Sequence, residues 1–377
     1  MDLSYWERDT FFSNVDIIII GSGIVGLSAA LCLKKRAPKL NIIILERGIL
    51  PMGASSKNAG FACFGSPGEL LEDLKTHSEN ELFSLVEKRW KGLLKLRKNL
   101  GDAAIDFQNL GGYEVFDNDL HFSQCADQLG DLNKHLSSIT GKKNTYQIAD
   151  AGITNFGLKQ IRHMILNTEE GQIDTGKMIH TLIKLVRNAG VEIINGAEIK
   201  KIEDESNQVT IRIATGLSIS CKQVIVATNG FAKQLLPSIS VQPARAQVLV
   251  TKPIQNLKLK GTFHYTTGYY YFRNIGNRVL LGGGRNLDFS AEETSQFGLT
   301  NLVQNKLNEL LQEMILPYTD YEVDMRWSGI MGLGNEKTSI VKAISKNIFC
   351  AVRMGGMGIS IGSLVGEEVA ELILQHR

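Results

Sequence analysis

The chain has 377 residues, of which 43% are hydrophobic, so it can form substantial cores in two domains or in one large discontinuous domain. Forty-one basic residues against thirty-nine acidic ones leave a formal net charge of +2. No global electric field therefore favours nucleic acid or an anionic membrane, and no nucleic-acid partner is expected.

The five cysteines are an odd number, are widely spaced and form no C-x-x-C pair. We expect reduced thiols, which favours a cytoplasmic location. The first apolar run is too short for a secretion signal or a membrane span, so neither export nor a transmembrane segment is expected. The polar stretch before it carries Tyr5, Trp6, Phe11 and Phe12, which we expect to pack across the edge of the first domain.

The stretch from Asp16 to Glu46 predicts a strand, a glycine turn, a helix and a second strand that together hold a dinucleotide. An apolar run over 15–20 has the composition of a parallel strand buried on both faces. Gly21, Gly23 and Gly26 then follow the G-x-G-x-x-G spacing, and an apolar helix begins at once. Glu46 closes the second strand, twenty residues after Gly26, where an acid can accept the ribose hydroxyls.

The next segments predict a loop followed by a move into a second domain. Small polar residues over 53–60 suit a loop along a bound ligand, or a simple surface loop. Apolar residues recur at helical spacing over 67–100, and residues 112–116 form a strand after a glycine turn. A further short helix is expected over 125–138.

A second crossover unit begins at Asp174, which can cap a helix that ends near Gly190 before a strand over 191–194. Residues 197–201, 209–213 and 218–221 alternate as a small antiparallel excursion would. A buried strand from residue 224 then ends in Ala227-Thr228-Asn229-Gly230, where the backbone could approach a ligand; a core strand with a turn is the alternative.

The stretch 243–285 has strand character, and its tyrosines alternate. Tyr269, Tyr271 and Arg273 fall on one face, which could line an aromatic pocket or belong to an ordinary sheet. The run Leu281-Gly282-Gly283-Gly284-Arg285 opens no apolar helix, so it does not qualify as a second nucleotide fingerprint.

The last part of the chain predicts an amphipathic helix over 299–316. An acidic strand follows, and residues 326–332 come directly after it. A strand over 348–352 leads into a glycine-rich loop over 353–358 and a final helix. The N-terminus of that helix would be a second place where anionic charge is favoured, or a tight strand-to-helix turn.

These motifs together resemble the flavin-dependent amine and amino-acid oxidoreductases that include D-amino-acid oxidase, glycine oxidase and sarcosine oxidase. The resemblance covers nearly the whole chain and rests on these elements: residues 21–26 with Glu46, 54–60, 171–174, 227–230, 327–329 and 355–358. Residues 244–247 and 269–273 are most similar to the branch that contains γ-glutamylputrescine oxidoreductase.

The resemblance implies an α/β fold with a discontinuous Rossmann-like FAD-binding domain at 1–80, 170–238 and 325–377. A second α+β substrate domain on a mainly antiparallel sheet would comprise 81–169 and 239–324. FAD would lie between them, with the pyrophosphate on the glycine turn and the pyrimidine end of the isoalloxazine at residues 356–358. The expected cofactor contacts are Gly21, Ser22, Gly23, Ile24, Gly26, Glu46, Arg47, Ser55, Ser56, Asn58, Ile199, Ala227, Thr228, Gly230, Gly356, Met357, Gly358 and Ile359.

The chain departs from the family pattern in the region that meets the substrate. Where many members carry an arginine that clamps a substrate carboxylate, this chain has Ile330, Met331 and Gly332. Arg273 and Arg353 are then the expected substitutes, or structural ion pairs, with Tyr271 beside the substrate. No cysteine lies between Cys221 and Cys350, near where covalent members attach flavin, so noncovalent FAD is expected.

The implied reaction is hydride transfer from an amine-bearing carbon to flavin, followed by hydrolysis of the imine. The expected partners are a small amine or amino acid and an electron acceptor, either oxygen or a quinone or protein. Two alternatives stay open: an FAD-dependent 2-hydroxyacid dehydrogenase, and a flavoprotein that acts on modified tRNA or binds flavin without turnover.

Overall fold

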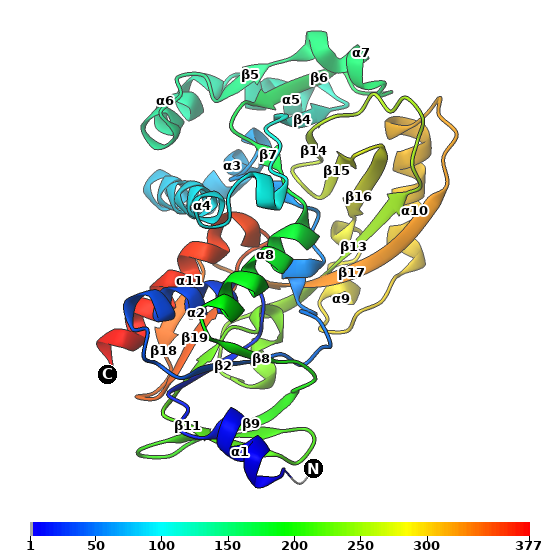
Figure 1. Ribbon diagram of the computed structural model, residues 1–377. Coiled ribbons are helices and arrows are strands. Elements are labelled where there is room, and N and C mark those ends of the chain that lie inside the picture. The colour runs from blue at the N-terminus through cyan, green and yellow to red at the C-terminus, as the bar shows by residue number, and fades with distance from the viewer. Residues whose placement is uncertain (1–2) are drawn as a thin grey trace.

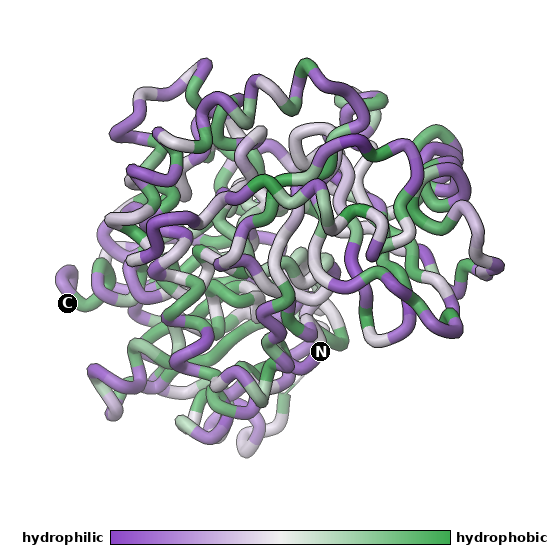
Figure 2. The backbone as a smooth tube through the Cα atoms, turned by 90° about the horizontal axis from the view of Figure 1, so that it is seen from above, coloured by the Kyte–Doolittle hydropathy of each residue, from purple (hydrophilic) through white to green (hydrophobic). Residues whose placement is uncertain are grey.

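Two large β-sheets organise the chain in the computed structural model, which describes residues 3–377 (Figure 1). The sheet that contains the first strands lies beside both termini, and the second sheet fans out above it. Hydrophobic stretches run through the middle of the molecule, and the outermost loops are mostly hydrophilic (Figure 2). The expected combination of a parallel nucleotide-binding sheet with a mainly antiparallel second sheet is confirmed.

The first sheet has the strand order β18-β19-β12-β1-β2-β8. All neighbours in it pair in parallel except the edge strand β18, which is antiparallel to β19. The bounds are β1 Ile17–Ile20, β2 Ile42–Leu45, β8 Glu192–Ile194, β12 Gln223–Val226, β18 Ile340–Ala343 and β19 Ile348–Val352. Because parallel strands end at the same edge, the loops after β1, β2, β12 and β19 meet there.

Both faces of this sheet are buried, which explains the continuous isoleucine run of β1. Ile17 and Ile19 face a core formed with the helices α2 (Ile24–Arg36), α8 (Thr175–Asn188) and α11 (Gly358–Gln375). Ile18 and Ile20 face a second core beneath an antiparallel three-stranded sheet of β9 (Ile199–Asp204), β10 (Val209–Ile213) and β11 (Ser218–Cys221). That small sheet is the excursion expected from the alternation in the sequence.

The second sheet has the order β17-β13-β16-β15-β14-β4-β6-β5. Its pairs are antiparallel apart from the parallel contact of β14 with β4. The bounds are β4 Gly112–Phe116, β5 Tyr146–Ile148, β6 His163–Asn167, β13 Gln242–Thr251, β14 Thr262–Tyr265, β15 Tyr270–Ile275, β16 Arg278–Gly283 and β17 Val323–Leu333. Helix α10 (Asn301–Leu310) and the π-helical turn Leu311–Ile315 pack on its outer face.

Two of the expected domain boundaries differ from the observed arrangement. Strand β17 pairs with β13 along its length, so residues 325–333 lie in the second sheet rather than with the FAD-binding part. Helix α4 (Glu79–Leu100) shares its apolar core with α2 and α11, although residues from 81 onward were expected in the substrate domain. Both differences arise because long-range packing, not chain order, decides which core an element joins.

Several expected elements have other bounds. The helix expected over 67–100 is interrupted and forms α3 (Pro67–Leu74) and α4, and the one expected over 125–138 is two helices, α5 (Asp119–Ala126) and α6 (Leu129–Thr140). Residues expected to line the domain edge form a helix, α1 (Tyr5–Phe12), in which Tyr5 and Trp6 are 69% and 74% exposed. The remaining short elements are β3 (Phe61–Ala62), β7 (Gly171–Gln172), α7 (Ile153–Phe156) and α9 (Phe289–Glu292).

Over residues 3–377, none of the helices is both long enough and apolar enough to cross a bilayer. The cysteines at 32, 63, 125, 221 and 350 form no disulfide in this structure.

Helices α4 and α11 cross closely at Gly92, which gives a stability prediction. A Cβ atom added at Gly92 would collide with the backbone carbonyl oxygen of Ser360. We expect Gly92→Ala to lower the free energy of unfolding by about 1–3 kcal/mol, because a backbone contact has little room to relax. Gly130→Ala in α6, where an added Cβ meets nothing within 4 Å, is the matched control and should be neutral or slightly stabilising. Equal denaturation midpoints for Gly92→Ala and wild type would contradict this close crossing.

Candidate functional site

A cavity of about 530 Å³ lies between the two sheets. One wall is formed by the loops that follow β1, β2, β12 and β19, and the other by residues of β13, β15, β16 and the hairpin that joins β14 to β15. Parallel α/β sheets bind ligands at this edge, so the fold itself places the cavity where a nucleotide site is expected.

The glycine turn forms one end of the cavity. Gly21 and Gly23 line it, and Gly23, the N-cap of α2, makes no side-chain capping bond. A Cβ added at Gly23 would lie 2.9 Å from the Ser55 Oγ atom, which accepts a hydrogen bond from the Ile24 N–H at 3.0 Å. Ser55 therefore satisfies one N–H group at the start of α2, while Gly21 and Gly23 add no side chain of their own, so the helix N-terminus can face a pyrophosphate.

Glu46 lines the same end, although its carboxylate already accepts four hydrogen bonds. Its Oε2 atom accepts from the Ser22 N–H at 3.0 Å and the Ser22 hydroxyl at 2.8 Å, and its Oε1 atom accepts from the N–H groups of Gly48 at 3.0 Å and Met52 at 3.4 Å. Glu46 thus fixes the glycine turn against the end of β2. A carboxylate has about four lone-pair sites, so a ribose hydroxyl would have to share a site or replace the long bond from Met52.

Thr228 carries a buried hydroxyl that has no hydrogen-bond partner among residues 3–377. The residue lines the cavity directly after β12, beside Ala227. An unsatisfied buried hydroxyl costs about 1–3 kcal/mol. Such a group at the edge of a nucleotide site fits a bound ligand that would accept or donate its missing hydrogen bond.

The glycine loop after β19 forms the middle of the cavity wall. Gly355 and Gly356 have left-handed backbone with φ of 60° and 83°, and the loop leads into α11, whose N-cap Met357 makes no side-chain bond. The side-chain oxygen of Asn229 accepts from the backbone N–H groups of Arg353 and Met354 at 3.0 and 3.2 Å, which holds the loop in place. A second helix N-terminus therefore faces the cavity.

Most of the expected cofactor contacts line this single cavity, and four do not. Those that line it are Gly21, Gly23, Ile24, Glu46, Arg47, Ser55, Asn58, Ile199, Ala227, Thr228, Gly356, Met357, Gly358 and Ile359. Ser22 binds Glu46, Ser56 donates to the Pro51 carbonyl, Gly26 packs against Gly21, and Gly230 packs against Met331. These four residues do not line the cavity themselves, and they support the segments that form its wall.

The substrate-side wall is aromatic, as the tyrosine alternation predicted. Tyr271 lines the cavity, and Tyr270 and Phe272 are buried in the core on the opposite face of β15. The Phe61 ring meets the Tyr271 and His264 rings edge to face, at centroid distances of 5.7 and 5.3 Å. Burial raises the pKa of the Tyr271 phenol to about 12, so this side chain is neutral.

Arg273 and Arg353 do not line the cavity, which revises their expected role. The Arg273 Nη1 atom donates to the carbonyls of Gly60 at 3.0 Å and Ile173 at 2.9 Å, and burial lowers its pKa to about 10. Arg353 donates to the Thr338 carbonyl at 2.8 Å and pairs with Glu336 at 2.6 Å. Both guanidinium groups bind carbonyl oxygens of neighbouring segments, so each fixes the backbone around the cavity.

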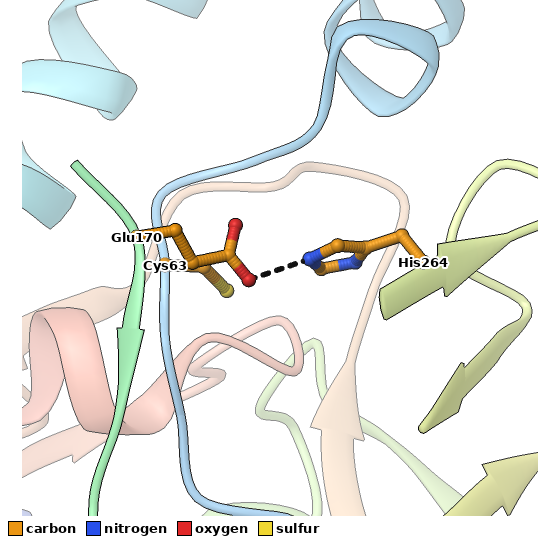
Figure 3. Close-up of side chains that lie close together, drawn as sticks. All are labelled: Cys63, Glu170 and His264. Atoms are coloured by element: carbon orange, nitrogen blue, oxygen red, sulfur yellow. Dashed lines mark hydrogen bonds and ion pairs between the residues drawn. The ribbon is translucent and has the colours of Figure 1, made fainter. Parts of the chain in front are cut away.

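The sequence did not indicate the buried cluster of Cys63, Glu170 and His264 (Figure 3). His264 on β14 lies opposite Tyr271 on β15. The Nε2 atom of His264 lies 2.7 Å from Oε1 of Glu170, whose side chain is fully buried, and the Sγ atom of Cys63 lies alongside. Burial lowers the pKa of His264, but the carboxylate of Glu170, followed by those of Glu69 and Glu114, raises it overall to about 9. Burial also raises the pKa of the Cys63 thiol, which lies beside the imidazolium–carboxylate pair of His264 and Glu170.

Glu114 lies behind this cluster and is a second perturbed group. Its carboxylate accepts from the Gly68 N–H at 2.7 Å, and burial raises its pKa to about 7. Glu69, at the start of α3, lines the cavity and lies 3.9 Å from the Nδ1 atom of His264. Residues from α3, β4, the β6–β7 loop and β14 meet only in the folded chain, which is why sequence patterns missed them.

The family model described as FAD dependent oxidoreductase, DAO, matches residues 16–372. This chain belongs to that family. The match covers both the nucleotide-binding sheet and the aromatic sheet opposite it, so the cavity between them is the expected place for FAD in a member of the family.

The chain has low sequence identity to its relatives. It is 23% identical to a probable oxidoreductase OrdL of Rhizobium meliloti over 96% of this chain and 83% of the relative. It is also 23% identical to a D-amino acid dehydrogenase of Helicobacter pylori, over 95% and 94% of the two chains. The structure resembles L-proline dehydrogenase from P. horikoshii, with a TM-score of 0.75, 17% identity and coverage of 96% and 94%. Glycine oxidase from Bacillus cereus gives a TM-score of 0.73, 17% identity and coverage of 97% and 96%.

The Thr228 hydroxyl allows a test of the cofactor cavity. We expect Thr228→Val to weaken FAD binding by about three- to tenfold, since the ligand loses one hydrogen bond. The same change should stabilise the apoprotein by about 1 kcal/mol, because an unsatisfied buried hydroxyl is removed. FAD titration of the apoprotein and denaturant unfolding measure the two effects. Unchanged FAD affinity would show that Thr228 does not meet the cofactor.

The His264–Glu170 pair gives a pH prediction. The pKa of His264 is raised from 6.5 to about 9 in the folded protein, so the pair stabilises the fold fully below pH 6.5 and the contribution is lost as pH rises through about 9. In wild type the free energy of unfolding should fall by at most about 3 kcal/mol as pH rises through this range, and we expect Glu170→Gln to remove that fall. The measurement is the free energy of unfolding from about pH 6 to 10 in both proteins. Parallel curves over that range would contradict the assigned ion pair.

Proposed function

We propose that the protein uses noncovalently bound FAD to oxidise a C–N bond of an amine or amino acid. The observation that carries the proposal is the single cavity, which runs from the glycine turn at Gly21 to the aromatic wall at Tyr271. Family membership supplies the cofactor class, and the continuity of the cavity supports a reacting group at the aromatic end.

The residues present fit the cofactor along its length. Gly21 and Gly23, at the N-terminus of α2, would hold the pyrophosphate, with Glu46 at the ribose and Ile199 near adenine. Gly356, Met357 and Gly358 would meet the pyrimidine end of the isoalloxazine, where the helix dipole of α11 favours negative charge. When bound, FAD would supply the two-electron oxidation, accepting a hydride from the amine-bearing carbon to leave an imine that water hydrolyses.

Noncovalent binding is supported by the state of the cysteine that lines the cavity. Cys63 lines the cavity and its sulfur lies 3.7 Å from that of Met357. Burial, together with the charges of Glu170 and Glu69, raises its pKa well above the usual value. A thiol of this kind is a poor nucleophile, so attachment to flavin is not favoured.

The aromatic end would position the amine and exclude water. Phe61 and Tyr271 form an apolar wall suited to the alkyl part of a substrate, and the carboxylate of Glu69 could accept a hydrogen bond from its nitrogen. An amine that enters neutral needs no strong base at this wall. The relatives named D-amino acid dehydrogenase, L-proline dehydrogenase and glycine oxidase support an amino-acid or amine substrate.

Similarity to OrdL also supports a position near the γ-glutamylputrescine oxidoreductase branch. The electron acceptor in this proposal is oxygen, a quinone or a protein.

The test is anaerobic reduction of the purified yellow protein. We expect amines or amino acids to bleach the flavin absorbance, with larger or N-substituted compounds faster than glycine and D-alanine. The 2-hydroxyacids lactate and 2-hydroxybutyrate should not bleach it, and FAD should be released intact on denaturation. Bleaching by hydroxyacids alone would replace this proposal with a hydroxyacid dehydrogenase, and flavin retained by the denatured chain would refute noncovalent binding.

A further inference from the structure

Arg285 is a cation in the cavity wall that has no part in the proposed cofactor contacts. It follows β16 through Gly283 and Gly284, whose φ values are 119° and 80°. A Cβ at Gly283 would collide with the carbonyl oxygen of Tyr269, so only glycine allows this tight turn. The turn places Arg285 in the same wall as Tyr269 and Tyr271.

The guanidinium of Arg285 has no carboxylate partner within residues 3–377, and none of the hydrogen bonds observed there involves it. The guanidinium lies over the Phe289 ring, 4.8 Å from the centroid, and interacts electrostatically with Tyr269. Burial lowers its pKa, a sign of partial desolvation. A half-buried guanidinium without an anion is costly, and a pairing anion from the cavity would relieve that cost.

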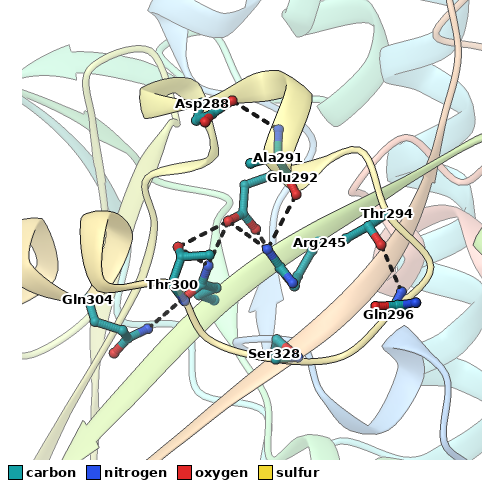
Figure 4. Close-up of polar contacts among 11 residues, drawn as sticks. Arg245, Asp288, Ala291, Glu292, Thr294, Gln296, Thr300, Gln304 and Ser328 are labelled. Atoms are coloured by element: carbon teal, nitrogen blue, oxygen red, sulfur yellow. Dashed lines mark hydrogen bonds and ion pairs between the residues drawn. The ribbon is translucent and has the colours of Figure 1, made fainter.

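Two of the three acidic residues on the same segment are engaged elsewhere (Figure 4). The Glu292 carboxylate accepts from Arg245 at 2.7 and 3.0 Å, from Gln247 at 2.8 Å and from Thr300 at 3.1 Å. Asp288 accepts from the Ala291 N–H at 2.9 Å and so caps the short helix α9. The third, Glu293, is exposed, and none of the three forms an ion pair with Arg285 within residues 3–377.

Four other lysines and arginines line the cavity. Lys57 resembles Arg285 in having a ring contact and no ion pair among residues 3–377, since its Nζ atom lies 5.4 Å from the centroid of the Phe297 ring. Lys337 pairs with Asp73 at 2.9 Å, and Arg89 donates to the Phe64 carbonyl at 3.0 Å. Arg47 lies 3.7 Å from the centroid of the Phe231 ring, at the dinucleotide end next to Glu46. Arg285 is thus the unpaired arginine that shares the wall with the tyrosines of the aromatic end.

We infer that Arg285 binds the carboxylate of the substrate, so that the enzyme selects amines that carry an anionic group. The inference rests on the proposed function and deepens it. A guanidinium offers two parallel N–H donors to a carboxylate, a geometry that a lysine cannot reproduce. This arrangement would supply, from the end of β16, the cation that is missing at residues 330–332.

The experiment measures binding without turnover. Two pairs of non-oxidisable probes, pyrrole-2-carboxylate with its carboxamide and benzoate with benzamide, are titrated calorimetrically into the FAD-loaded protein. We expect wild type to bind at least one carboxylate about tenfold or more tighter than its amide. Arg285→Gln should abolish that preference, weakening carboxylate binding by about 30-fold or more with the amide unchanged, and Arg285→Lys should restore it in part.

Arg278→Gln is the matched control. Arg278 lies at the start of β16, the strand that leads to Arg285, and pairs with Asp324 at 2.5 Å outside the cavity wall, so its loss removes equal charge and should leave the carboxylate preference intact. The inference is overturned if wild type shows no carboxylate preference, or if Arg285→Gln retains it, or if Arg278→Gln abolishes it equally.

The Arg285 binding test and the flavin-bleaching test of the proposed function can fail independently. If no amine bleaches the flavin but the carboxylate preference disappears in Arg285→Gln, the anion site stands and the proposed reaction falls. If amines bleach the flavin while Arg285→Gln behaves as wild type, the reaction stands and the assignment of Arg285 falls.

Discussion

The arrangement of this protein depends on the burial of β1 between β2 and β12. Each of these strands pairs in parallel with β1 in register, and side chains on both faces are withdrawn from water into two separate cores. Because both faces of β1 are buried, the strand is a continuous run of isoleucines. Because the strands pair in parallel, the loops that follow them lie at one edge of the sheet. The glycine turn, Glu46 and Thr228 meet at the cavity because of this geometry.

The second sheet is tied to the first by backbone carbonyls that accept hydrogen bonds from side chains. Arg273 on β15 donates to the carbonyls of Gly60 and Ile173, and the indole N–H of Trp327 on β17 donates to the carbonyl of Lys57 at 2.9 Å. Buried carbonyl groups in loops need such partners, since no ladder satisfies them. The same residues therefore fix the distance between the two walls of the cavity.

Charge is distributed unevenly around the aromatic end of the cavity. Glu170, Glu69 and Glu114 surround the single imidazolium of His264, which keeps that corner negative or neutral. Arg285 stands in the same wall without an anion, while Glu292 behind it is saturated by Arg245, Gln247 and Thr300. Such separation of opposite charges in a desolvated wall orients a polar ligand more than it strengthens its binding.

The sequence by itself determined the nucleotide-binding unit, because its signals are local. The spacing of Gly21, Gly23 and Gly26, the Asp174 cap of α8 and the alternation of Tyr270 and Phe272 with Tyr271 depend only on the period of each element. Only the tertiary structure decided the substrate side. Arg273 shares a strand face with Tyr271, yet it does not line the cavity and bonds to the carbonyls of Gly60 and Ile173, whereas Arg285 reaches the wall through two left-handed glycines. His264 and Glu170 lie 94 positions apart and pair through the packing of β14 on the β6–β7 loop. Contacts between distant segments depend on sheet order and register, which no local pattern encodes.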